Sequence, residues 1–559
     1  MRRDNQVLHR IIAAIGQVVD HEFSGPTGQH QSFHQMLGNL SHEDVAAPAY
    51  EHSAHRPPQY QWSLASTTIS PRFSIITPVY DPPLGAFLAC VDGVLSQSFT
   101  DWEWCVVDDC STRPEVRDAL SALADRDPRV RVQHRTVNGG IVAASNDALA
   151  MACGEFIALL DHDDKLVPTA LERMAATIDS TEGVDYVYSD EAHVLADGRE
   201  SAHFLKPDWS PERFRSSMYT CHLSVLRRDV VSELGGFRAD FNGSQDHDLI
   251  LRATELIAAR NHRVVHLPFL TYHWRNISSS VSRATSSLNT AVARGRQAVQ
   301  EQCDRLGLDA TVVHGPVEGT YRLVRSVPAD LPITVVVPTR AEGGAARPFR
   351  LAAAATIEGL RTTHPATRLV VTYPASLPPE LVSLLDDAAG DRWELLPVTA
   401  DWSIAAALDR AFNDYPCEVL VSVAPGLVPR SDLTPDWLET LAGLARSPGT
   451  GLAGAMVADD NDLVLHAGWD VPNFRWYELE GLRVDTRSTG NDLLIERECT
   501  QVSLAAAAIT AGHWRECRDR ANGGFDAAGR SLSDALTAAG ARTLWTPYAR
   551  FDQVVAIDR

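Results

Sequence analysis

The sequence lacks three features that would place it in a specialised class of protein. None of its nine cysteines forms a Cys-x-x-Cys pair, so it offers neither a zinc-ribbon nor a thioredoxin-like motif. No run approaches the roughly 18 to 20 apolar residues that a membrane-spanning helix needs. Basic residues are scarce, with 50 Lys and Arg against 72 Asp and Glu, which leaves a net charge of −22. A protein that binds duplex nucleic acid needs a basic face, so we exclude that class.

The remaining composition is that of an ordinary globular protein, with 45% apolar and 22% charged residues. A chain of 559 residues is too long for one hydrophobic core, so we expect two or three domains. Most cysteines fall in apolar runs, which is typical of buried free thiols in a reducing compartment. The apolar run at residues 11–15 is too short for a signal peptide. We therefore expect a cytoplasmic protein, and leave open its oligomeric state and a peripheral contact with a membrane or partner protein.

The chain is expected to fall into three parts. Residues 1–70 contain one helical stretch near 6–20 and then a His-, Gln-, Ser- and Pro-rich stretch, which predicts a partly helical, loosely ordered extension. From residue 73 onward, strand-like runs alternate with helical stretches, the pattern of βαβ units in a mostly parallel α/β sheet. The expected strands are Phe73–Ile76, Trp104–Val107, Val130–Gln133, Phe156–Leu160 and Val184–Tyr188, and the expected helices are Leu84–Ser96, Glu115–Leu123, Ala143–Ala152 and Ala170–Ile178.

One turn in this part is unusually acidic. The strand that ends at Leu160 is followed directly by Asp161, Asp163 and Asp164. Carboxylates this close repel one another unless a cation or a hydrogen-bond network offsets their charge. Asp-x-Asp at the carboxyl end of a strand can hold a hard divalent ion and leave sites for phosphate oxygens. Asp109 follows another strand and is expected to face the same crevice, which weighs against an ordinary acidic surface turn.

The sequence then repeats itself. The segment from Ile333 to Pro338 echoes Phe73 to Pro78, and Glu418-Val-Leu-Val-Ser-Val423 echoes Glu155-Phe-Ile-Ala-Leu-Leu160. Gly523-Gly524-Phe525 later echoes Gly235-Gly236-Phe237, and the order of the three matches is preserved. We infer an internal duplication, with a first domain at 71–320, a linker near Pro316–Pro332 and a second domain at 330–559.

The second copy serves as an internal control for the acids. It has Ala424-Pro425-Gly426 in place of the acidic turn, and Thr372-Tyr373 in place of Asp108-Asp109. Because it keeps the apolar strand and loses the carboxylates, the acids are not needed to form the turn. One acid is expected to persist, with Asp534 as the counterpart of Asp246. The comparison favours a functional site in the first copy and a non-catalytic second copy.

Several motifs of the first copy together resemble the catalytic domain of family 2 glycosyltransferases, which has the GT-A nucleotide-sugar fold. The second copy resembles the degenerate second domain of tandem bacterial members used in surface-polysaccharide assembly. The motifs are Ile76-Thr-Pro-Val-Tyr80, Val107-Asp-Asp-Cys-Ser111, Leu160-Asp-His-Asp-Asp164, Tyr188-Ser-Asp-Glu191, Phe204-Leu-Lys-Pro-Asp-Trp209, Gly235-Gly-Phe237, Gln245-Asp-His-Asp-Leu249 and Tyr272-His-Trp274.

This resemblance implies the parts of a donor site. A divalent metal, Mn²⁺ or Mg²⁺, is expected on Asp163, with Asp161 toward the ribose or the metal. His273 would complete the metal shell from a later loop. The metal would neutralise the diphosphate of a UDP-, dTDP- or GDP-sugar as the glycosidic bond breaks. Asp109 would accept from a pyrimidine imide. The residues expected to bind the nucleotide-sugar are Thr77, Pro78, Tyr80, Asp109, Asp161 and Asp163.

The same resemblance implies the acceptor side. Asp246 matches the family's catalytic base, although Gln245 stands where the family more often has Glu, and the choice between Asp246 and Asp248 stays open. A single displacement would invert the anomeric centre without a covalent enzyme intermediate. The acceptor would be a glycan, in particular a lipid-linked cell-surface glycan. Residues expected to shape this side are Asp190, Glu191, Lys206, His222 and Asp248.

Two other functions fit parts of the sequence. A sugar nucleotidyltransferase also uses an α/β sheet with an acidic metal site, but it would carry a glycine-rich basic loop where this chain has Tyr80-Asp-Pro-Pro83. A non-catalytic glycan-binding or scaffolding protein fits the second copy, whereas the acids of the first copy speak against it. The expected activity is therefore metal-dependent glycosyl transfer by the first copy.

Overall fold

The computed structural model describes residues 71–195, 199–275, 285–340, 346–360, 362–398, 401–469, 479–488 and 490–554. The chain divides into two units, Met1–Thr68 and Ile69–Arg559. The extension predicted at 1–70, with its helix near 6–20, lies outside the described residues. Among the helices that are described, none combines the length and the apolar character needed to cross a bilayer. All nine cysteines are free thiols.

The first sheet has nine strands, which are β1 (Phe73–Val79), β2 (Trp102–Asp108), β3 (Val130–His134), β4 (Phe156–Leu159), β5 (Lys165–Leu166), β6 (Val184–Val194), β7 (Glu200–Phe204), β8 (Ser224–Arg227) and β9 (Arg263–Arg275). Their order is β3-β2-β1-β4-β8-β6-β9-β5, with β7 paired to β6. The first four in this order are parallel, β8 is antiparallel to both neighbours, and β6 and β9 are parallel. All five strands expected from the sequence are present.

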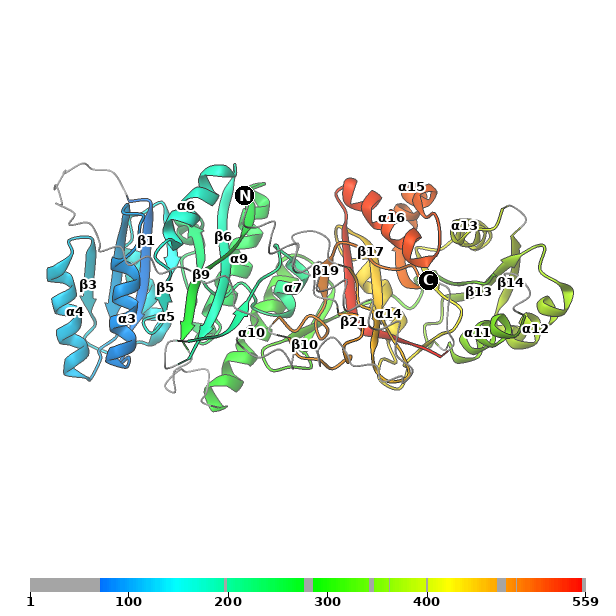
Figure 1. The fold of residues 1–559 in the computed structure, drawn as a ribbon, viewed down its shortest axis with the longest axis horizontal. Helices are drawn as coiled ribbons and strands as arrows, with labels where there is room; N and C mark the ends of the chain where they lie inside the picture. Colours follow the sequence, from blue (N-terminus) through cyan, green and yellow to red (C-terminus); the bar gives the residue numbers. More distant parts are fainter. Residues whose placement is uncertain are drawn as a thin grey trace, which may run out of the picture. The chain divides into compact units, whose positions relative to one another are not determined.

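Helices cover both faces of this sheet (Figure 1). Alternate residues of β1 enter two different cores: Ile75 packs with α3, α4 and α6, and Ile76 packs with α5 and α9. Burial on both faces explains why the central strands are continuously apolar. The helices are α3 (Leu84–Leu95), α4 (Pro114–Arg126), α5 (Gly140–Met151), α6 (Ala170–Ser180), α7 (Pro211–Ser216), α8 (Arg228–Glu233), α9 (Gln245–Ala259) and α10 (Thr285–Arg305), with the short 3-10 helix η1 (Ala239–Phe241).

A second sheet repeats the strand order of the first. Its order is β14-β13-β12-β15-β20-β17-β21-β16, with β18 on β17 and an additional strand, β19, on β21. Its strands are β12 (Ile333–Pro338), β13 (Thr367–Pro374), β14 (Glu394–Val398), β15 (Val419–Val423), β16 (Leu427–Pro429), β17 (Thr450–Ala458), β18 (Val464–His466), β19 (Arg497–Cys499), β20 (Ala506–Thr510) and β21 (Arg542–Gln553). The expected α/β class, with two GT-A-like, mostly parallel mixed sheets, is confirmed.

Helices also pack on the second sheet, and a hairpin precedes it. The helices are α11 (Ala346–Gly359), α12 (Pro379–Ala389), α13 (Ile404–Asp414), α14 (Trp437–Ala445), α15 (Ala511–Cys517) and α16 (Phe525–Ala538), with η3 (Gly390–Arg392) and η4 (Arg518–Arg520). Strands β10 (Ala310–His314) and β11 (Tyr321–Arg325) form an antiparallel hairpin, so the segment predicted as a linker contains a paired strand. Since Ile69–Arg559 forms one compact unit, the boundary between the two copies stays a prediction.

Strand pairing aligns the two copies and corrects two sequence correspondences. Pro78 pairs with Val107 and Pro338 pairs with Thr372, so Tyr373-Pro374 replaces Asp108-Asp109, one residue later than predicted. The equivalence of Asp534 with Asp246 is wrong. Asp246 lies in the first turn of α9, whereas Asp534 lies well inside α16. At the helix start the second copy has Asp526, the second residue of α16, where the first has Asp246, the second residue of α9.

The same alignment extends to β6 and its counterpart β17. The pairing of β6 with β8 and that of β17 with β20 align the two copies. In this alignment Met456 and Val457 are equivalent to Asp190 and Glu191. Both acids of β6 are thus apolar in the second copy. His222, which lies just before β8, corresponds to Ala505 by the same register. The second copy keeps the frame of the first and loses the acids of the turn and of β6, together with this histidine.

Candidate active site

The acidic turn lies at the carboxyl end of β4, beside β1 in the middle of the sheet. Asp164 is buried and accepts hydrogen bonds from the Tyr272 hydroxyl, at 2.7 Å, and from the Arg275 backbone N–H, at 2.7 Å. The side chain of Asp161 is 44% exposed and is available to a ligand. Tyr272 and Arg275 both belong to β9, so a strand far from β4 in the sequence fixes the shape of the turn that follows β4.

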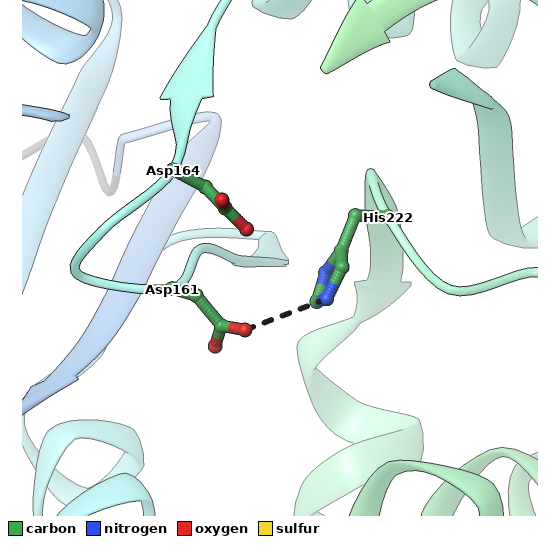
Figure 2. A group of neighbouring side chains, drawn as sticks. All are labelled: Asp161, Asp164 and His222. Carbon is green, nitrogen blue, oxygen red and sulfur yellow. Dashed lines mark ion pairs between the residues drawn. The ribbon is translucent and has the colours of Figure 1, made fainter. Parts of the chain in front are cut away.

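His222 faces this turn from the segment that precedes β8. Figure 2 shows its imidazole opposite the two carboxylates, with Nε2 3.6 Å from Oδ2 of Asp161. Asp161, Asp164 and His222 each offer one ligand atom, and these atoms lie within 4.8 Å of one another. The His222 ring stacks on Tyr272 with centroids 4.7 Å apart, and its buried Nδ1 has no hydrogen-bond partner among the described residues. One imidazole and two carboxylates form a donor set that suits Mn²⁺ and also accepts Mg²⁺.

The electrostatics of the turn favour a bound cation. Burial, together with the charges of Asp161 and Asp163, raises the pKa of Asp164 well above its usual range. The pKa of Asp163 is raised by burial and by Asp161, although His162 opposes the shift. Each carboxylate is therefore hard to ionise beside the others, and a divalent cation among them would offset that repulsion.

The ligand set differs from the one predicted from the sequence. Asp163 and His273 were expected to hold the metal, but neither belongs to the group of facing ligand atoms. His273 instead pairs with Glu200 of β7, with Nε2 3.2 Å from Oε1. The two residues lie on strands that flank β6 on opposite edges. Asp164 was inside the quoted acidic motif and could have been named. His222 has no neighbouring acid in sequence, so only the fold shows that it faces the turn.

Asp246 lies across a small pocket from the acidic turn. Burial and the charge of Asp161 raise its pKa to about 6, against the opposing effects of His222 and a hydrogen bond from Gln245. A carboxylate with this pKa is ionised at neutral pH and is a stronger base than an ordinary aspartate. The pocket is lined by Ile76, Pro78, Ile141, Ser145, Leu159, Leu160, Asp161, His222, Phe237, Gln245 and Asp246.

Asp248, the other candidate base, is committed to structural contacts. Its buried carboxylate is paired with Arg238 and with Arg252, whose Nη2 lies 2.8 Å from Oδ2. Arg252 also donates to the carbonyls of Leu234 and Gly236, so the pair fastens α9 to the Gly235-Gly236 turn. Asp248 is also not among the residues that line the pocket, whereas Asp246 is. The geometry therefore favours Asp246.

The residues expected around the nucleotide are placed in three different ways. Pro78 lines the pocket, and Tyr80 is exposed at the end of β1. Thr77 does not face the pocket, because its buried hydroxyl accepts a 2.9 Å hydrogen bond from the Trp104 indole. Both oxygens of the buried Asp109 accept backbone N–H groups, from Gly139 at 2.8 Å and Gly140 at 2.7 Å. Asp109 therefore holds the start of α5 in place.

Three residues expected on the acceptor side lie beneath His222. The Nζ of Lys206 donates to Glu191 at 3.0 Å and to the carbonyls of Thr220 and His222. Glu191 also accepts the His222 backbone N–H at 3.1 Å. Although burial opposes ionisation, Lys206 and neighbouring histidines lower the pKa of Glu191 to about 2. This buried pair, with Asp190 accepting the Lys206 backbone N–H, fixes the segment that presents His222.

A family model and several curated proteins match this chain. The family model described as glycosyl transferase family 2 matches residues 74–235, which include β1, the acidic turn and His222. Among curated proteins, "Uncharacterized protein y4gI" of Sinorhizobium fredii is 33% identical over 71% of this chain and 43% of its own length. "O-antigen biosynthesis protein RfbC" of Myxococcus xanthus is 30% identical over 73% of this chain and 31% of its own length. The chain thus spans less than half the length of these relatives.

Solved structures with similarity to the chain are more distant. The S. aureus TarS fragment 1-349 in complex with UDP-GlcNAc is 21% identical, with a TM-score of 0.32, and the match covers 42% of this chain and 72% of that one. The mannosyltransferase PcManGT from Pyrobaculum calidifontis, in complex with GDP-Man and Mn²⁺, is 16% identical, with a TM-score of 0.29 and coverage of 43% and 75%.

Proposed function

This chain belongs to glycosyl transferase family 2, and on that premise we propose that its first sheet transfers a sugar from a nucleotide-sugar donor to a glycan acceptor with inversion at the anomeric carbon. One observation carries the proposal: Asp161, His222 and Asp246 line a single pocket at the carboxyl ends of the parallel strands. That edge of an open α/β sheet is where such folds bind ligands. The pocket joins a candidate cation site to a buried base.

Asp246 would act as the general base. In its ionised form it accepts the proton of an acceptor hydroxyl as that oxygen attacks the anomeric carbon of the donor. The new bond joins the acceptor oxygen to this carbon, while the bond from the carbon to the phosphate oxygen breaks and the nucleoside diphosphate leaves. One displacement from the opposite face inverts the centre. The raised pKa of Asp246, about 6, fits this role.

A divalent cation would be held by Asp161, Asp164 and His222. When bound, it supplies positive charge to the leaving diphosphate. Tyr272 orients two of these groups, by a hydrogen bond to Asp164 and by stacking on His222. The buried Glu191–Lys206 pair fixes the backbone on which His222 sits. These supports keep the candidate ligands in place before any substrate arrives.

The identity of donor and acceptor is part of the same proposal. Pro78 and Tyr80 lie where the nucleotide of a UDP-, dTDP- or GDP-sugar would meet the end of β1. The relative described as an O-antigen biosynthesis protein supports a surface polysaccharide, built on a lipid carrier, as the acceptor. Because a lipid-linked acceptor would lie in a membrane, we also propose peripheral association at the inner face of the cell membrane. The second copy, which lacks the acidic turn and the counterpart of His222, would be non-catalytic.

The test is nucleotide release from a panel of nucleotide-sugars in the presence of Mn²⁺ and a lipid-linked glycan fraction. We expect release from one donor class, and its loss in Asp246→Asn. Asp534→Asn is the matched control, since Asp534 lies in α16 of the second copy and accepts a hydrogen bond from Gln501. Full activity in Asp246→Asn would refute the assignment of the base. Retention of the product's anomeric configuration would refute the single displacement.

A further inference from the structure

The short helix α7 connects the candidate site to the second sheet. Its six residues, Pro211–Ser216, include three buried charged side chains, those of Glu212, Arg213 and Arg215. The chain that leaves α7 runs directly to the segment that carries His222. Such a density of buried charge is unusual, because taking ions out of water is costly unless each is paired. The partners of these side chains lie on both sides of α7.

On one side, α7 is fastened to the second sheet next to β19, as Figure 1 shows. Arg213 pairs with Asp492 and donates to the Gly490 carbonyl at 3.3 Å. Although burial opposes it, Arg213 and Arg497 lower the pKa of Asp492 to about 2. Ser210, which caps the start of α7, also accepts the Glu498 backbone N–H at 3.3 Å.

Glu212 adds a second link to the same face. Its carboxylate contacts Arg325 of β11 at 3.1 Å and Arg542 of β21 at 3.4 Å. Arg325 in turn donates to Glu496, beside β19, at 2.7 Å. Burial works against the charge of Glu212, yet the surrounding arginines bring its pKa to about 2. The hairpin between the two sheets therefore takes part in a continuous buried ionic network.

On its other side, α7 is fastened to α9, the helix that begins with the candidate base. The Nε2 of the buried His247 lies 2.9 Å from the Phe214 carbonyl. Burial lowers the pKa of His247 to about 4, so the ring is neutral and donates from Nε2. Arg215 donates to Gln302 at 3.0 Å, and Gln302 donates to the Leu251 carbonyl of α9 at 3.1 Å. His247 is the direct neighbour of Asp246.

We propose that the second sheet positions the catalytic base: Asp492, through Arg213 and α7, and His247, through the Phe214 carbonyl, are positioning residues that hold Asp246 in the pocket. This inference rests on the proposed function of the first sheet. It gives the second copy a role in the reaction without any contact with substrate. A displacement of about 1 Å in a reacting group can lower a rate on the order of 100-fold, so a small shift of α9 is sufficient.

The experiment uses the full chain and three variants. Asp492→Asn weakens the link to the second sheet without changing the size of the side chain. His247→Phe removes the donor to Phe214, whereas His247→Gln places an amide N–H near the same position. The control is Asp432→Asn, which alters an exposed ion pair with Arg430 elsewhere in the second sheet. For each variant we would measure kcat, the donor KM and the melting temperature. We would also measure hydrogen–deuterium exchange in α7 and in the first turn of α9.

We expect kcat to fall about tenfold or more in Asp492→Asn and His247→Phe at a temperature where each variant is folded, with donor KM close to that of the parent chain. Asp492→Asn should also lower the melting temperature, because it leaves the buried Arg213 facing a neutral group. His247→Gln should recover most of the rate, and the control should match the parent. Exchange should quicken in α7 and at the start of α9 in the two impaired variants.

Unchanged kcat and unchanged exchange in Asp492→Asn would overturn the proposal. So would a parallel loss of kcat, donor affinity and melting temperature, which is the mark of a merely structural contact. The exchange measurement needs no turnover, so it judges this coupling even if the parent chain fails to transfer sugar. An inactive parent chain would count against the proposed function, and unaltered exchange would count against the positioning role.

Discussion

The hydroxyl of Tyr272 donates a hydrogen bond of 2.7 Å to Oδ2 of Asp164, and the ring of the same tyrosine stacks on His222. One side chain of β9 thus orients two of the three candidate metal ligands. Groups behind the ligands commonly tune a metal site almost as strongly as the ligands do. In the second copy, the pairing of β17 with β21 puts Phe551, an aromatic residue without a hydroxyl, at the position of Tyr272.

The first prediction concerns this tyrosine. Tyr272→Phe keeps the stacked ring and removes the hydroxyl, so Mn²⁺ affinity should weaken by roughly 10- to 100-fold. The Mn²⁺ concentration for half-maximal nucleotide release measures it, with Tyr415→Phe in the second sheet as the control. An unaltered Mn²⁺ requirement would show that the hydroxyl does not support the site.

The second prediction separates the two possible ligand sets. Asp161→Asn and His222→Ala should raise the Mn²⁺ requirement strongly, whereas His273→Ala should leave it close to that of the parent chain. The reason is geometric, since only the first two side chains belong to the group of facing ligand atoms. Chelation of the metal should abolish nucleotide release, and added Mn²⁺ should restore it. The reverse ranking of His222 and His273 would favour the set predicted from the sequence.

The third prediction concerns the two acids at the start of α9. Asp246→Asn should lower kcat by about 10²- to 10⁴-fold, the usual range for loss of a general base, with little change in melting temperature. Asp248→Asn should instead destabilise the protein by about 3–5 kcal/mol, because it leaves two arginines facing a neutral group. Thermal unfolding and steady-state kinetics on both variants distinguish the roles. A stable but inactive Asp248→Asn variant would show that Asp248, and not Asp246, is the base.

The fourth prediction is a pH dependence. Asp246 has a raised pKa of about 6 and acts only when ionised, so kcat should be full above that pH and fall as the pH drops through about 6. Because the charge of Asp161 contributes to the shift, a cation bound to Asp161 should move the fall to lower pH. A pH–rate profile at two Mn²⁺ concentrations measures both effects. A rate that is flat from pH 5 to 8 would contradict the assignment.

The sequence predicted the fold well because the signal there is local. Apolar runs such as Phe73–Ile76 mark strands buried on both faces, and the repeat of the same pattern from Ile333 indicated the second sheet. The acidic turn was also visible, since its residues are consecutive. Matching by spacing failed at Asp534, because the link from Gly523-Gly524-Phe525 into α16 is shorter than the link that leads to α9.

The candidate site was predicted only in part, because several of its contacts join distant segments. His222 faces Asp161 only once β8 lies beside β4. Thr77 was assigned to the base pocket, but its strand position turns it toward Trp104 on the other face. No pattern in the sequence distinguishes the two acids Asp246 and Asp248 by their partners. Their difference depends on Arg238 and Arg252, which only the fold brings to Asp248.

The replacement of Asp190 and Glu191 by Met456 and Val457 has a consequence for how the protein withstands heat. Exchanging buried charges for apolar side chains of similar size is often neutral or stabilising, by about 1–4 kcal/mol. In the first copy the buried Glu191 needs Lys206 as its partner, whereas Val457 of the second copy needs none. The first copy would then carry the reaction, and the second copy would be the more stable of the two. On heating, we expect catalysis to be lost at a lower temperature than the one at which the second copy unfolds. The temperature of inactivation and the temperature of complete unfolding need not coincide.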